Sequence, residues 1–278
     1  MEFKQRKILL SNNRMAVIMV NYNMDHVIRQ NINYLHRAVK YPFDIFIVDQ
    51  SSDDKWRFKA KENENIIQAN LNYNFRAPLA YNMCLKLADS YAEWNQTPEY
   101  KYYLVCATSG LMDPEGNKEE DIYTPCIEFL EENEDAVMIQ PAYQADSQAM
   151  NAHMFNTGSG KPRKVMHFEY LLSVFRGDWL REQNGWNTAM LIHGQDLWFS
   201  YLARMEGKTM WVHEGFEIKK EEHNSYNSGR MSDNPGSRSA NAMETLIPFG
   251  QTMLGPDWWN RIWTDYAEPG WRNPQVLI

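Results

Sequence analysis

Unbroken apolar runs alternate with helix-like patterns through the first half of the chain. Residues 15–20 and 45–48 are such runs, and each is followed directly by polar residues, as is typical of strands buried on both faces. Between them, Ile28, Ile32 and Leu35 recur at the spacing of one helix face. The alternation continues with strands predicted at 65–69, 102–106 and 136–139 and helices predicted at 80–91 and 122–130.

Repeated strand–helix–strand units with short connections predict an α/β fold, with a Rossmann-like, mostly parallel central sheet flanked by helices. Ligands of such sheets bind at the carboxyl ends of the strands. In this chain those ends fall at 21–23, 49–54 and 108–110, which are rich in Asn, Asp, Ser and Thr. We therefore expect a binding site to form from these three segments.

The second half of the chain has a more mixed pattern. Residues 151–165 look like a mobile loop that could order over a bound ligand. A helix is predicted at 196–205 because Gly207 follows it as a stop signal. The polar stretch 221–239 is predicted to be flexible. Short strands are predicted at 168–175, 208–212 and 216–218.

Composition narrows the class of protein. The 278 residues are 44% hydrophobic, which is enough for a sizeable core and excludes a disordered chain. The 28 Lys and Arg against 36 Asp and Glu give a net charge of −8, which argues against non-specific binding to nucleic acid or to anionic membranes. Residues 115–135 hold nine acids and one lysine, so this segment alone accounts for the net charge. An anionic small ligand elsewhere on the chain is therefore not excluded.

The cysteines and the N-terminus bear on location. Cys84, Cys106 and Cys126 are odd in number and lack metal-ligand spacing, which suits reduced thiols in the cytosol. The apolar run at residues 8–10 is too short for a signal peptide or a membrane-spanning helix. We expect a cytoplasmic protein and leave open a peripheral attachment to a membrane.

Five segments stand in a recognisable order along the chain. They are 17–23 (VIMVNYN), 47–53 (IVDQSSD), 72–82 (NYNFRAPLAYN), 175–187 (FR leading to NGWN) and 194–198 (GQDLW). This series resembles family 2 glycosyltransferases of the GT-A fold. The resemblance implies a hexosyl- or pentosyltransferase that inverts the anomeric centre. It would move one sugar from a nucleoside-diphosphate sugar, most often a UDP-sugar, to a hydroxyl of a glycan or glycoconjugate acceptor.

The resemblance covers roughly residues 14–225 and implies how the chain is divided. A GT-A glycosyltransferase domain would occupy residues 1–225, with a donor-binding half at about 14–140 and an acceptor-binding half at about 141–225. Residues 226–278 are expected to form a C-terminal extension that packs on the same domain.

Donor contacts are expected at the strand ends. Asp49 can accept a hydrogen bond from a pyrimidine N–H or a ribose hydroxyl, and Tyr22 or Tyr73 can stack on the base. The forked guanidinium of Arg76 can neutralise a diphosphate. An ordinary turn is the competing explanation for Asn21. The predicted donor contacts are Asn21, Tyr22, Asn23, Asp49, Ser51, Arg76, Asn82, Ser109 and Gly110.

Asp196 is the candidate general base. An inverting transfer removes a proton from the acceptor hydroxyl as it attacks, and a carboxylate within hydrogen-bond reach is the usual group for this. The resemblance places Asp196 at a helix start facing the acceptor. A simple N-cap residue is the competing explanation for the same position. His193 and Trp198 are the candidate acceptor contacts, although an aromatic residue on a helix more often belongs to the core.

The metal site of the family is degenerate in this chain. Family members usually carry Asp-x-Asp, or one Asp, after the fourth strand, whereas the sequence TSGLMD here has no carboxylate before Asp113. The family's later metal-binding histidine falls near Lys219-Lys220 or His223. Under one hypothesis, Asp113 and His223 bind Mn²⁺ or Mg²⁺ with shifted geometry. Under the other, Lys219 or Lys220 acts with Arg76 in place of the metal.

Other functions remain as alternatives. The missing Asp-x-Asp is also what a non-catalytic nucleotide-sugar or glycan-binding relative would show. A sugar-phosphate nucleotidyltransferase should carry a Gly-rich, Arg-containing loop after the first strand, which 21–23 does not resemble. Residues 158–161 (GSGK) have only a faint likeness to a phosphate loop, because the first glycine and the following Ser or Thr are missing. An ordinary loop is predicted there.

Overall fold

A computed structural model describes most of the chain. The described residues are 14–62, 64–147, 154–189, 194–220, 251–252 and 255–257. The candidate residues His193 and His223, and nearly all of the predicted C-terminal extension, lie outside them.

Four parallel strands make up one side of the sheet. In spatial order they are β3 (Ile66–Asn70), β2 (Phe43–Asp49), β1 (Met15–Asn21) and β4 (Tyr102–Cys106). Every residue of β1 and β4 is buried, which explains the unbroken apolar runs of the sequence. The chain passes from β2 to β3 through a short 3₁₀ turn, η1 (Asp54–Trp56).

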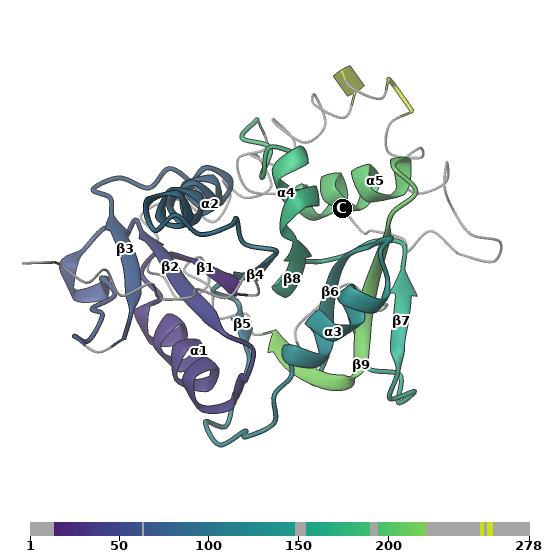
Figure 1. The fold of residues 1–278 in the computed structure, drawn as a ribbon, viewed down its shortest axis with the longest axis horizontal. Coiled ribbons are helices and arrows are strands. Elements are labelled where there is room, and N and C mark those ends of the chain that lie inside the picture. Colours follow the sequence, from purple (N-terminus) through teal and green to yellow (C-terminus); the bar gives the residue numbers. More distant parts are fainter. Residues whose placement is uncertain are drawn as a thin grey trace, which may run out of the picture.

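Two helices cover these strands. Helix α1 (Asp25–Ala38) follows β1, and helix α2 (Ala77–Trp94) leads back from β3 to β4 (Figure 1). The two crossovers run in opposite directions along the sheet, so right-handed connections place the helices on opposite faces. All three strand ends predicted to carry polar residues therefore meet at one edge of the sheet, which positions the candidate site.

Beyond β4 the sheet becomes mixed. Strand β8 pairs antiparallel with β4 and with β6, and β9 runs parallel to β6. In the described residues the sheet has nine strands, and the α/β fold with a helix-flanked central sheet is confirmed. The elements of this half are β5 (Gly110–Leu111), α3 (Thr124–Glu132), β6 (Ala136–Tyr143), β7 (Pro162–Val165), β8 (Leu172–Arg176), α4 (Gly177–Glu182), α5 (Gln195–Met205) and β9 (Thr209–Lys220).

Three features of this half differ from the sequence-based expectation. The predicted strands at 208–212 and 216–218 are one strand, β9, which contains a bulge opposite Pro141. The strand predicted at 168–175 begins only at Leu172. Residues 162–165, predicted as loop, pair with β9 as strand β7. Among the residues that the structure describes, no helix combines the length and apolar character needed to cross a membrane.

Candidate functional site

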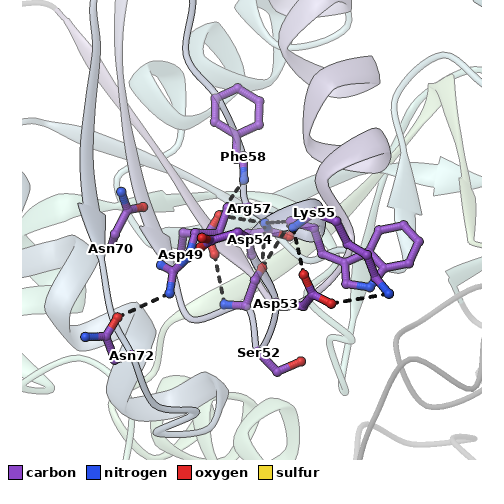
Figure 2. Close-up of polar contacts among 12 residues, drawn as sticks. Asp49, Ser52, Asp53, Asp54, Lys55, Arg57, Phe58, Asn70 and Asn72 are labelled. Atoms are coloured by element: carbon purple, nitrogen blue, oxygen red, sulfur yellow. Dashed lines mark hydrogen bonds and ion pairs between the residues drawn. The ribbon is translucent and has the colours of Figure 1, made fainter.

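The carboxyl ends of β1 and β2 are joined side chain to side chain. Asn21 and Asp49 are register partners, and the Asn21 amide donates to Asp49 at 2.8 Å and to the Ser51 hydroxyl at 3.1 Å. The buried Asp49 carboxylate also accepts from the backbone N–H of Ser51 at 2.9 Å and of Phe58 at 2.6 Å (Figure 2). Asp49 therefore holds the loop that follows β2 in place.

Asn23 connects the same two segments from the other side. Its φ of 59° lies in the left-handed region, which asparagine tolerates better than most residues. Its side-chain oxygen accepts from the N–H of Ser52 at 3.0 Å, and its own N–H donates to the Ser51 hydroxyl at 3.1 Å. Tyr22, half-buried, stands between the two asparagines. The turn-forming explanation for Asn21 and Asn23 is thus part of what the structure shows.

Gln50, which the sequence analysis missed, brings in the segment after β3. Its side-chain oxygen accepts from the N–H of Phe75 at 2.9 Å, although the two residues are 25 positions apart. The next residue, Arg76, is half-buried and has a φ of 70°. Tyr73 is 71% exposed, and its ring lies 5.6 Å from that of Phe75. The only sequence signal for Gln50 was a polar side chain directly after a buried strand.

Asn82 faces the acceptor half of the chain. Its amide donates to the carbonyl of Trp186 and accepts from the N–H of Trp186, both at 2.7 Å. Gly185 beside it has a φ of 70°, and a Cβ there would lie 2.3 Å from the Asn82 oxygen. Asn82 thereby docks α2 against residues 184–187. Its role as a donor contact stays a prediction.

The turn after β4 completes this edge. The N–H of Gly110 donates to the carbonyl of Ala107 at 3.0 Å, and Ser109 is partly exposed at its tip. Gly110 begins β5, in which it is the register partner of Lys220 at the end of β9. A Cβ at Gly110 would come within 2.8 Å of the Leu171 side chain, so close packing requires glycine here.

Asp113, a candidate metal ligand, is committed elsewhere. The carboxylate is buried and forms an ion pair with Arg37 of α1. It also accepts from the backbone N–H groups of Gly116 and Lys118, both at 2.9 Å. These contacts close the turn at 113–118. Both oxygens of Asp113 are thus in use within the protein.

The donor set of the described residues does not fit a divalent cation. Such ions prefer several carboxylate or carbonyl oxygens that converge on one point. Within the described ranges there is no group of three or more His, Cys, Asp and Glu side chains that could hold a metal. The second proposed ligand, His223, lies outside those ranges. We therefore route no chemical step through a metal.

Asp196 lies in the first turn of α5, two residues inside the helix. The N-cap is Gly194, with a φ of 91°, so the N-cap explanation for Asp196 is wrong. One carboxylate oxygen accepts from the N–H of Leu197 at 3.0 Å, and the other lies 3.8 Å from Nε2 of His167. The side chain is 31% exposed. Asp196 is thus accessible and has an imidazole beside it.

His167, which the sequence analysis missed, is buried next to Asp196. Burial lowers the pKa of His167 to about 4, against an opposing effect of the nearby Glu169 charge. The imidazole is therefore neutral at pH 7. Its Nδ1 lies 3.4 Å from the hydroxyl of Ser200, and that hydroxyl donates to the carbonyl of Asp196 at 2.6 Å. A histidine 29 positions from Asp196 left no local signal in the sequence.

Of the two candidate acceptor contacts, only Trp198 is described. Its indole is partly exposed and stacks on the ring of Tyr201 with centroids 6.1 Å apart. His193 lies outside the described residues. Contact of either residue with an acceptor stays a prediction.

The glycine-rich loop at 158–161 surrounds a carboxylate of the protein itself. Glu214 of β9 accepts from the hydroxyl of Thr157 at 2.6 Å, from the N–H of Ser159 at 3.1 Å and from Arg163 at 2.5 Å. Burial alone would raise the pKa of Glu214, but these hydrogen bonds outweigh it and lower the pKa to about 2. The loop is thus anchored to β9, and the mobile-loop prediction is wrong for its described part.

Glu214→Gln should make the protein less stable at neutral pH and flatten its response to acid. Because the folded pKa is below the unfolded value of 4.5, ionised Glu214 stabilises the fold above about pH 4.5. That contribution, at most about 3 kcal/mol, is lost as the pH falls toward 2. Urea unfolding at pH 7 and pH 3 measures the change. Glu134→Gln, at an exposed position, is the control and should match the wild type at pH 7.

Comparison with known proteins gives a fold and no family. No model of a known protein family matches the chain, and no curated protein matches it significantly. Among solved structures, S. aureus TarS superposes with a TM-score of 0.53 at 14% identity, covering 91% of this chain and 48% of TarS. This chain therefore spans about half the length of TarS.

Two ligand complexes are similar as well. S. aureus TarS 1–349 in complex with UDP gives a TM-score of 0.53 at 14% identity, over 91% of this chain and 80% of the other. The mannosyltransferase PcManGT from Pyrobaculum calidifontis, in complex with GDP-Man and Mn²⁺, gives 0.56 at 12% identity, over 91% and 74%. Identities this low establish the fold alone. The fold is that of GT-A glycosyltransferases, and membership of family 2 stays a prediction.

Proposed function

We propose that the protein is an inverting glycosyltransferase. It moves one sugar from a nucleoside-diphosphate sugar, with UDP as the first candidate, to a hydroxyl of a glycan or glycoconjugate. The observation that carries the proposal is Asp196. On a GT-A fold, a partly exposed carboxylate stands in the first turn of α5 with one oxygen 3.8 Å from a buried, neutral histidine. The complexes of similar structures with UDP and GDP-Man support the donor class.

The proposed chemistry is a single displacement. The acceptor oxygen forms a bond to the anomeric carbon while the bond from that carbon to the diphosphate oxygen breaks. Asp196 takes the proton of the acceptor hydroxyl during the attack, so the oxygen is a better nucleophile in the oxocarbenium-like transition state. The neutral ring of His167 puts no competing positive charge beside the base at pH 7. Attack from the face opposite the leaving group inverts the anomeric centre.

The donor side is proposed at the joined ends of β1, β2 and β4. The Asn21–Asp49–Ser51 network gives this edge a rigid frame. In this proposal Tyr22 stacks on the base and Arg76 faces the diphosphate. The remaining proposed contacts are Asn23, Asn82, Ser109 and Gly110, and the proposed acceptor contacts are Trp198 and His193.

A panel of nucleotide sugars tests this function. UDP-, GDP- and CMP-sugars are added with and without Mn²⁺, and both the melting temperature and the release of free nucleotide are measured. We expect one donor to stabilise the fold, by about 2.7 kcal/mol at 100 times its Kd, and to release its nucleoside diphosphate. A donor that binds but is neither transferred nor hydrolysed would instead indicate the non-catalytic relative.

A further inference from the structure

We infer that Lys220 supplies the positive charge that faces the donor diphosphate, in place of a divalent cation. The inference rests on the proposed function and names the group that binds the leaving diphosphate. It starts from the misfit between a metal and the donor set of the described residues, in which Asp113 is committed to Arg37 and to its own turn.

The backbone places Lys220 at the turn after β4. Strand β9 ends beside β5, with Lys220 in register with Gly110 and Lys219 in register with Leu111. The turn before Gly110 directly continues β4, whose carboxyl end is at the ligand-binding edge of the parallel strands. A cation at the end of β9 is therefore next to the segment where an acidic metal ligand is missing.

The side chain of Lys220 lies on the inner side of that turn. Its ammonium forms an ion pair with Glu169, and the two side chains are 21% and 15% exposed. Glu169 precedes Leu171 by two residues, and the carbonyl of Leu171 accepts from the N–H of Ala107 at 2.7 Å. Glu169 also acts electrostatically on His167, beside Asp196. The ion pair thus stands between the donor turn and the proposed base.

The other lysines nearby are less suitable. Lys219 precedes Lys220 on a strand, where successive side chains point to opposite faces, and it pairs at 2.9 Å with Asp146, which is 67% exposed. The ammonium of Lys118 donates to the carbonyls of Met112 and Glu217 and so connects two backbone segments. Lys220 is the one of these three whose partner is a mostly buried carboxylate.

The chemistry requires no covalent step. The departing diphosphate gains negative charge as its bond to the sugar breaks, and an ammonium close to it stabilises that charge. Lysine binds phosphate as a compact point charge. Before the donor binds, Glu169 neutralises Lys220. The diphosphate then competes with Glu169 for the same ammonium, so the two residues should affect donor binding with opposite signs.

Calorimetric binding of UDP and of uridine in the presence of EDTA tests the inference, with GDP and guanosine as a second pair. Lys220→Gln should weaken diphosphate binding roughly 10- to 100-fold and leave nucleoside binding unchanged. Glu169→Gln should strengthen diphosphate binding. Lys219→Gln is the matched control and should bind as the wild type does. Urea unfolding of each variant verifies that it is folded.

Several results would overturn the inference. Equal loss of UDP and uridine binding in Lys220→Gln, or weaker UDP binding in Glu169→Gln, would mean that the ion pair only supports the fold. Wild-type protein that binds UDP or GDP only when Mn²⁺ is added would refute the inference and leave the proposed function intact. Wild-type protein that binds neither nucleotide under any of these conditions would refute both.

Discussion

Replacing Asp196 with Asn should lower the rate of sugar transfer about 10²- to 10⁴-fold while donor binding stays close to wild type. The amide keeps the shape of the side chain and can still accept from the N–H of Leu197, which lies 3.0 Å away in the wild type. It cannot take the proton of the acceptor hydroxyl. Transfer rates at saturating donor and acceptor, together with the Kd of the donor, measure the two effects separately.

Asp178→Asn is the matched control for this variant. Asp178 lies in the first turn of α4 and accepts from the N–H of the next residue, Trp179, at 2.8 Å, as Asp196 does with Leu197. It should leave the transfer rate unchanged. If Asp196→Asn retains transfer within about tenfold, Asp196 is not the base, and His193 becomes the next candidate.

Asp49→Ala should lower the free energy of unfolding by about 3–5 kcal/mol. The side chain is fully buried, and its removal leaves the N–H groups of Ser51 and Phe58 and the amide of Asn21 without their acceptor. Urea unfolding at pH 7 measures the loss. Donor binding should weaken as well, because the loop after β2 loses its anchor.

Asp54→Ala provides the comparison within the same loop. Asp54 is 92% exposed and contacts only Arg57 among the residues drawn in Figure 2, so its removal should change stability by no more than about 0.5 kcal/mol. Asp49→Ala protein of near wild-type stability that no longer binds UDP would contradict this account. Asp49 would then be a direct ligand of the donor, as the sequence resemblance implies.

The first half of the fold could be predicted because its signals are local. A strand buried on both faces must be apolar throughout, and the predicted strand ends at 21–23 and 49–54 follow directly from where β1 and β2 stop being apolar. The second half could not be predicted as well. Strand β7 exists through its pairing with β9, about fifty positions away, and β9 continues across a bulge opposite β6. Neither pairing has a signature within one segment.

The candidate site divides in the same way. Order along the chain was enough to single out Asp49 and Asp196 as carboxylates worth testing. What each carboxylate does depends on partners that folding brings from a distance, since polar groups in an interior must find hydrogen bonds wherever the fold supplies them. Asp113 contacts Arg37, 76 positions earlier, and Glu214 contacts the loop at 157–163. Sequence proximity could not have indicated either contact.

By itself, then, the sequence determined the α/β class, the edge of the sheet where polar segments gather and the helix that carries Asp196, because apolar periodicity and helix signals act over a few residues. Only the tertiary structure decided which of the polar residues are frame and which face outward. It committed Asp49 and Asp113 to internal hydrogen bonds and placed neutral His167 beside Asp196. It also brought Lys220 next to Gly110, because register between distant strands is set by the packing of the whole sheet.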